Sequence, residues 1–219
     1  DYDGGGWTMI SVHSDDGQFN WTWNNRHYFD TDTTTFGSLG ALNEDFKSPA
    51  LHDVGMEDLL FIHQPSDIWA AYNQLDSSGS YGEFIGSFGE RLCYDGDEGY
   101  PLSAGTLTHT GQLCNTQLFI NPEDHDNGCP SSDSVDGAYG PAWSIDSNNG
   151  CPLDDPGILS GLGPIGYQDT YDDEWLILRE NTFGIGFGWA LGYDGTPTGA
   201  ATNYMQVLVR RDYIDADGD

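Results

Sequence analysis

Two aspartates that stand two residues apart, Asp124 and Asp126, are the strongest candidates for chemistry in this sequence of 219 residues. They lie in a run rich in Asn, Gly and Pro, in which Glu123 adds a third carboxylate. Clusters of this kind are often solvated turns. Here the crowded like charges repel one another unless a cation or solvent offsets them, and hard oxygen ligands at this spacing suit Ca²⁺. The sequence therefore favours a calcium site, whose candidate ligands are Asp124, Asp126, Asn127, Gly128 and Asn121.

The stretch that carries these residues runs from Asn121 to Cys151. Pro and Gly interrupt it repeatedly and no apolar period survives, so we expect an irregular loop without helix or strand. A short apolar strand at Leu118–Ile120 should deliver the chain into this loop. A loop that follows a strand is rigidly held at one end, as a binding site requires.

Composition limits the classes of partner. The chain has 36 acidic and 6 basic residues and a net charge of −30, which repels nucleic acids and anionic membrane surfaces. The 30 glycines together with 7 Trp, 12 Tyr and 10 Phe indicate a loop-rich domain with an aromatic core. No apolar stretch reaches the length of a membrane span. We expect cations as partners, no nucleic acid and no membrane insertion.

The four cysteines, Cys93, Cys114, Cys129 and Cys151, match neither a metal knuckle nor a redox pair. Two disulfides formed in an oxidising compartment fit better, and four cysteines allow three connectivities. We therefore expect a secreted, extracellular or cell-surface protein.

Several regular elements can be anticipated along the chain. Residues 8–13 should form a strand after a glycine turn, Leu59–Ile62 a buried strand and Tyr204–Arg211 the last strand. Residues 66–75 should form a short helix. Trp7 and Trp175 are expected on strands within the core.

Three parts of the sequence resemble a known family. Asp3-Gly4-Gly5-Gly6-Trp7-Thr8 is similar to the signature near the start of fibrinogen-like domains, and Ser11-Val12-His13 is similar to the intelectin branch, the X-type lectins. Thr35-Phe36-Gly37-Ser38 and the run from Asn43 to Pro49 also resemble intelectins. Asp124, Asp126, Cys129, Trp143 and Cys151 stand in the order of a fibrinogen-like calcium loop and its disulfide, although Pro152 stands where ficolin-like lectins tend to carry His.

The resemblance implies an α+β fold: a loop-rich fibrinogen C-terminal-like domain with a small twisted antiparallel sheet, short helices and an irregular calcium-binding region. The length of the chain, which contains no linker-like stretch, favours one domain over residues 1–213. The Asp-rich residues 214–219 are expected to be an acidic linker or the start of an Asp-rich calcium repeat of a longer multidomain protein. The resemblance also implies a Cys129–Cys151 disulfide, which leaves Cys93 to pair with Cys114.

The function that the resemblance implies is calcium-dependent binding of glycans on cell or particle surfaces. A sugar hydroxyl or diol can replace water on Ca²⁺, and aromatic faces can hold the ring. Tyr139, Trp143, Trp189 and Tyr193 are the candidate aromatic residues. A calcium-stabilised protein–protein adhesion module and a glycoside hydrolase remain alternatives. No nucleophile motif and no zinc-binding histidine pair is present, so we expect no enzyme.

Overall fold

The computed structural model describes residues 2–14, 16–18, 20–21, 25, 27–75, 79–86, 100–106, 201–202 and 204–211, and the backbone of residues 118–121 and 140–143. Its main sheet contains six strands: β1 (Thr8–Ser14), β2 (Phe46–Lys47), β3 (Asp58–Gln64), β4 (Ile68–Tyr72), β5 (Ala104–Gly105) and β8 (Tyr204–Arg210). A second sheet pairs β6 (Leu118–Asn121) with β7 (Gly140–Trp143). The helices are short: α1 (His27–Asp30), α2 (Ala50–Asp53) and α3 (Tyr81–Gly86).

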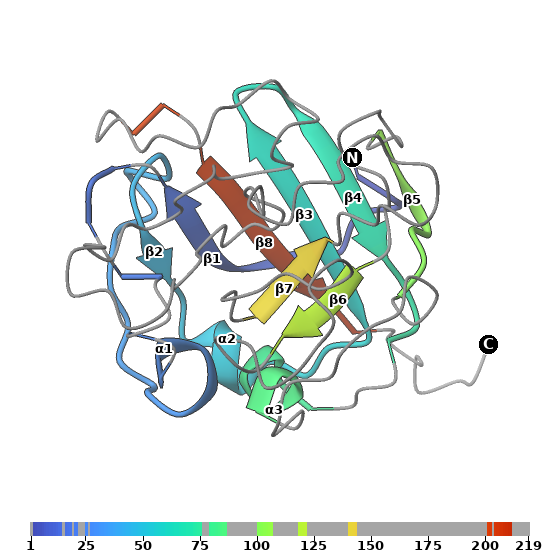
Figure 1. The fold of residues 1–219 in the computed structure, drawn as a ribbon, viewed down its shortest axis with the longest axis horizontal. Helices are drawn as coiled ribbons and strands as arrows, with labels where there is room; N and C mark the ends of the chain where they lie inside the picture. Colours follow the sequence, from blue (N-terminus) through green and yellow to red (C-terminus); the bar gives the residue numbers. More distant parts are fainter. Residues whose placement is uncertain are drawn as a thin grey trace, which may run out of the picture.

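The last described strand lies in the middle of the main sheet, whose order is β2-β1-β8-β3-β4-β5 (Figure 1). Each pair of neighbouring strands in this sheet is antiparallel. Along β8 the buried residues are Met205, Val207 and Val209, in strict alternation with partly buried ones. Because the side-chain period of a strand is two, this pattern fixes which face of β8 meets the core. The two ends of the described chain therefore fold as one unit around β8.

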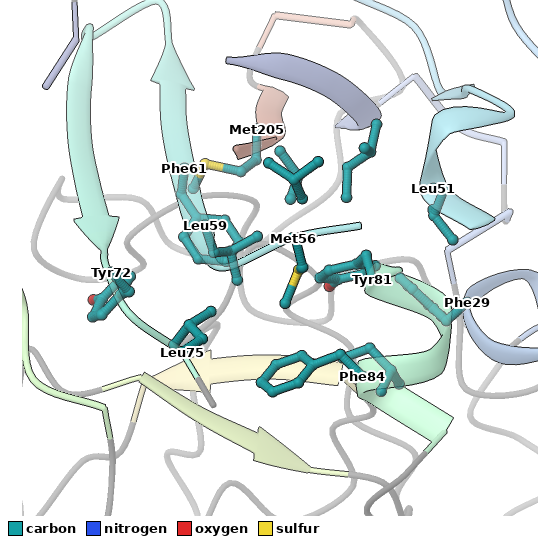
Figure 2. Close-up of a cluster of buried hydrophobic side chains, with 14 of the residues drawn as sticks. Phe29, Leu51, Met56, Leu59, Phe61, Tyr72, Leu75, Tyr81, Phe84 and Met205 are labelled. Carbon is teal, nitrogen blue, oxygen red and sulfur yellow. The ribbon is translucent and has the colours of Figure 1, made fainter. Parts of the chain in front are cut away.

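The main core lies between one face of this sheet and the short helices (Figure 2). Leu59 and Phe61 on β3 and Tyr72 on β4 belong to the same buried cluster as Met56, Tyr81 and Phe84. Such large side chains bury much apolar area, and each fully buried one contributes about 1.5–3 kcal/mol. The described part of the chain is thus an antiparallel sheet covered by short helices, consistent with the expected α+β class.

The strands expected at residues 8–13, Leu59–Ile62 and Tyr204–Arg211 are confirmed as β1, β3 and β8. The helix expected at residues 66–75 is wrong, because this segment contains the strand β4, which pairs with β3 from Leu59↔Tyr72 to His63↔Ile68. A short apolar run fits either a strand or a buried helix, and here the pairing with β3 decides for the strand.

The expectation of an irregular loop from Asn121 to Cys151 is also wrong in part. Asn121 ends β6, and Gly140–Trp143 forms β7. Pro141 lacks an N–H group, but a strand with one described partner tolerates proline, as edge strands do. Tyr139 and Trp143 were placed on a loop, and Trp143 instead belongs to a strand.

Trp7 was expected on a strand in the core, and this is correct only in part, because Trp7 packs against the buried cluster of Leu60, Ile62 and Ala71 but lies outside β1. Trp7 precedes β1 and is partly buried. Its indole Nε1 donates to the carbonyl of Tyr2 at 2.8 Å, and the Arg210 guanidinium lies 4.2 Å from its ring centroid. Trp175 lies outside the described residues.

Candidate functional site

The β6–β7 pair brings together the two ends of the segment that carries the candidate calcium ligands. Asn121 is the register partner of Gly140, and Leu118 is the partner of Trp143. Opposed residues of an antiparallel pair lie about 5 Å apart at Cα. Asn121 and Gly140, the described residues on either side of residues 122–139, are therefore adjacent, so that the two ends of this segment are held together by backbone pairing.

The structure places only part of the predicted site. Asn121 lies at the end of β6 and Trp143 at the end of β7. The other predicted residues lie outside the described residues: Asp124, Asp126, Asn127, Gly128, Tyr139, Trp189, Tyr193, Cys93, Cys114, Cys129 and Cys151. Calcium ligation and disulfide pairing at these positions remain predictions from the sequence.

A first polar cluster joins the start of the chain to β8. The Arg210 guanidinium donates to Asp58 Oδ2 at 2.8 Å through Nε and lies 3.2 Å from Asp3 Oδ2 through Nη2. It also donates to the carbonyls of Asp3 at 2.6 Å and Gly5 at 3.2 Å. Burial lowers the pKa of Arg210, but Asp58 and Asp3 outweigh burial, so the net shift is upward. Arg210 is therefore engaged by its own chain and holds the glycine turn, where Gly4, Gly5 and Gly6 have φ near +80°.

A second polar cluster surrounds the buried carboxylate of Asp45. Its Oδ1 accepts a hydrogen bond from the Ser14 backbone at 2.9 Å, and its Oδ2 accepts one from Asn20 Nδ2 at 3.1 Å. The Asp45 backbone N–H in turn donates to Asp16 Oδ2 at 2.8 Å. These bonds join β1 to the chain before β2. Within the described ranges, no three His, Cys, Asp or Glu side chains gather as a metal ion would require.

A third polar cluster lies around the one lysine of the sequence, Lys47, which is 1% exposed. Its ammonium donates to the carbonyl of Asp32 and lies 5.5 Å from the Tyr28 ring centroid. Burial lowers the pKa of Lys47, while Asp32 and Asp30 oppose the shift. The same carbonyl lies 3.0 Å from His52 Nε2. A carbonyl oxygen only accepts hydrogen bonds, so His52 must carry a hydrogen on Nε2.

One contact in the described part has the form of a catalytic pair. Ser11 Oγ and His13 Nε2 are 3.0 Å apart, as a nucleophile and its base would be. Both residues are buried, with 0% and 2% of their surface exposed. A substrate cannot reach a hydroxyl in that position, so we interpret the pair as part of the core.

Sequence reasoning missed all of these clusters. Arg210 and Asp58 are 152 residues apart, and nothing in local pattern links them. The sequence did offer a clue to Lys47, because a single lysine in a strongly acidic chain can be expected to have carbonyl or carboxylate partners. Asp45 stood unremarked within the run from Asn43 to Pro49 that the family resemblance used.

Among the helices that the structure describes, none is both long and apolar enough to cross a lipid bilayer. No model of a known protein family matches the chain, and no curated protein matches its sequence.

Proposed function

We propose that this chain is an extracellular, calcium-dependent glycan-binding module with a fibrinogen-like fold of the intelectin kind. The observation that carries the proposal is the Asp124-x-Asp126 pair within a segment whose ends, Asn121 and Gly140, are paired. Pairing at the base lowers the entropy that the segment must lose when a cation gathers its oxygens. The ligand residues are assigned from the pattern of the sequence.

The chemistry of the proposed site is cation-assisted recognition of a hydroxyl pair. Ca²⁺ accepts six to eight oxygens in flexible geometry, and an acidic loop of this size leaves positions for water. A sugar diol can replace that water, while Tyr139, the residue before Gly140 in the sequence, and Trp143, at the end of β7, are candidates to pack against the ring. The fibrinogen-like resemblance near the start of the chain and in the region from Asp124 to Cys151 supports this assignment.

The experiment is a titration with a panel of diol-bearing glycans in calcium and in excess chelator. We expect binding in calcium, loss of binding in chelator, and loss in Asp126→Ala and Trp143→Ala. Glu44→Ala is the matched control, because Glu44 is exposed and its replacement removes one negative charge that is not part of the segment's sequence.

Calcium-independent binding, or binding that survives in both Asp126→Ala and Trp143→Ala, would contradict the proposal. A protein whose stability responds to calcium but that binds no glycan would point to the protein–protein adhesion alternative. Release of reducing sugar from a bound glycan would point to the hydrolase alternative.

A further inference from the structure

His13 lies in an aromatic stack that joins three parts of the fold. Its ring, on β1, is 4.3 Å from the Trp21 ring and 5.8 Å from the Phe29 ring between centroids. Trp21 and Phe29 also contact each other at 4.8 Å, and Trp21 Nε1 donates to the carbonyl of Val12 at 2.7 Å. Phe29 belongs to α1. The imidazole therefore connects the sheet to its cover, which we define as Trp21 together with α1.

Within the described part of the chain, no group is placed to accept a hydrogen bond from a second N–H of this ring. Nε2 shares a hydrogen bond with Ser11 Oγ, and the buried Nδ1 has no hydrogen-bond partner among the residues that the structure describes. Across the sheet, His13 is the register partner of Met205, whose other partner is His63 on β3.

The titratable and charged groups of the packed elements do not compensate either. They are Lys47 on β2, His27, Tyr28 and Asp30 on α1, Tyr204 and Arg210 on β8, and Asp58 and His63 on β3. Burial is the cause that lowers the pKa of His13 to about 3. In a chain with 36 acidic residues, this histidine lacks a described carboxylate partner.

We propose that His13 is an acid-sensitive latch between β1 and the cover: protonation of its ring releases Trp21 and α1 from the sheet while β3 and β4 stay paired. A buried imidazolium would need acceptors for two N–H groups, and among the residues that the structure describes Ser11 alone is in place. Opening the cover lets water supply the second acceptor. The face of the Trp21 ring attracts the protonated His13 ring, but this attraction compensates only part of the missing hydrogen bond.

The sign of the pH effect follows from linkage. The closed state holds the pKa of His13 below that of an exposed histidine, so the stability of the closed state is present above about pH 6.5 and is lost on acidification. Opening takes up one proton in this range. The open population therefore rises about tenfold per pH unit from about pH 6.5 down to the closed-state value.

Hydrogen exchange at two amides near α1 tests the latch. The N–H groups of Thr31 and Asp32 donate to the carbonyl of His27 at 3.0 and 2.7 Å and close the end of α1. After correction for the intrinsic pH dependence of exchange, we expect their opening constant to rise about tenfold between pH 6.5 and 5.5. The amides of β3 and β4 should show no such rise. In His13→Gln, the rise near α1 should fall to the smaller dependence that His52 contributes through its contact with the carbonyl of Asp32.

His63→Gln is the matched control, because it removes a buried histidine in the same row of the sheet but outside the stack. It should keep the wild-type rise near α1. An equal rise in His13→Gln, or equal opening of β3 and β4, would overturn the proposal, since the second result is global acid unfolding.

A measurement on the wild type covers the case in which His13→Gln does not fold. In ¹³C-labelled protein, the ring signals of His13 should carry a strong ring-current shift from Trp21. This shift should disappear at the pH at which the ring becomes protonated. A His13 ring that takes up its proton while the ring-current shift and the protection of Thr31 and Asp32 persist would equally overturn the latch.

Discussion

Arg210 and Asp58 form an ion pair in which two guanidinium nitrogens reach one carboxylate oxygen. Nε lies 2.8 Å and Nη2 lies 2.7 Å from Asp58 Oδ2. The Asp58 side chain is 3% exposed, and its other oxygen accepts a hydrogen bond from the Gln74 backbone at 2.9 Å. The pair thus ties β8 to β3 and to the turn after β4.

Replacing Arg210 by Met should destabilise the protein, because the Asp58 carboxylate stays buried without its cation. Removing one partner of a buried pair costs about 3–5 kcal/mol, and the partial exposure of Arg210 places the expected loss near the lower end. Arg210→Lys should recover only part of the loss, since an ammonium cannot reproduce the several directed donors.

Urea unfolding with an unchanged m-value is the measurement. Arg211→Met, at the exposed neighbouring position, is the control and should lie within about 0.5 kcal/mol of wild type. Equal losses in the two variants would mean that the pair contributes nothing specific.

Gly82 provides a second prediction, because α3 approaches α2 and α1 closely at this position. A Cβ on Gly82 would lie 2.5 Å from His52 Nδ1 and 2.9 Å from the carbonyl oxygen of Phe29. Gly82→Ala should therefore lower the free energy of unfolding by about 1–3 kcal/mol through overpacking.

Gly86→Ala in the same helix is the matched control, because the added Cβ would meet Asp30 Cβ at an ordinary 3.6 Å. We expect its stability within about 0.5 kcal/mol of wild type. Thermal unfolding of both variants decides the matter, and a Gly82→Ala protein as stable as Gly86→Ala would show that His52 and Phe29 can move aside.

The sequence predicts correctly the strands in which buried residues either alternate with more exposed ones or follow one another without a break. β8 alternates strictly and β3 is buried along almost its whole length, and both patterns are visible in the sequence. β4 was not recognised, because Ile68–Tyr72 is a short apolar run whose state depends on its pairing with β3. The place of β8 between β1 and β3 could not be derived, since it depends on contacts between distant segments.

The candidate site was predictable in composition but only partly in position. The sequence identifies carboxylates that suit a cation, and the structure adds that Asn121 and Gly140 pair at the base of their segment. The sequence could not identify His13 as a buried ring, because a histidine on an apolar strand looks the same whether or not Trp21 and Phe29 cover it.

His52 supplies a prediction on pH. Burial lowers its pKa, and the Lys47 charge lowers it further, while hydrogen bonds to the backbone act against the shift. The unfolded state therefore takes up the proton first, so the contribution of His52 to stability is present above about pH 6.5 and is lost below it. Relative to His52→Asn, the wild type should lose stability between pH 7.5 and 5.5. Urea unfolding at the two pH values measures the difference, and parallel losses would contradict the role of His52.

The disulfides can be mapped directly. The family resemblance predicts Cys129–Cys151 and leaves Cys93–Cys114, each closing a loop of about twenty residues and contributing about 3 kcal/mol in the chain-entropy model. Peptide mapping without reduction should recover these two pairs. A peptide that joins Cys114 to Cys129 would exclude the predicted connectivity.

Calcium should stabilise the folded protein. For a dissociation constant of an extracellular module, about 10⁻⁴ to 10⁻³ M, 10 mM Ca²⁺ should add about 1–3 kcal/mol by mass action. The melting temperature in calcium and in chelator is the measurement. Asp126→Ala should abolish the shift and leave the chelated protein folded, whereas Glu44→Ala should keep it. An unchanged melting temperature in wild type would remove the calcium site.

The burial of Lys47 has a consequence for the covalent chemistry of this protein. It is the only lysine in the sequence, and 1% of its surface is exposed. Apart from the α-amino group, the folded chain therefore presents no ready amine to acylating reagents, aldehydes or amine-coupled sensor surfaces. The ammonium becomes available only when the corner formed by Tyr28, Asp32 and Lys47 opens. Acylation at this one side chain thus reports the opening of a single corner of the fold.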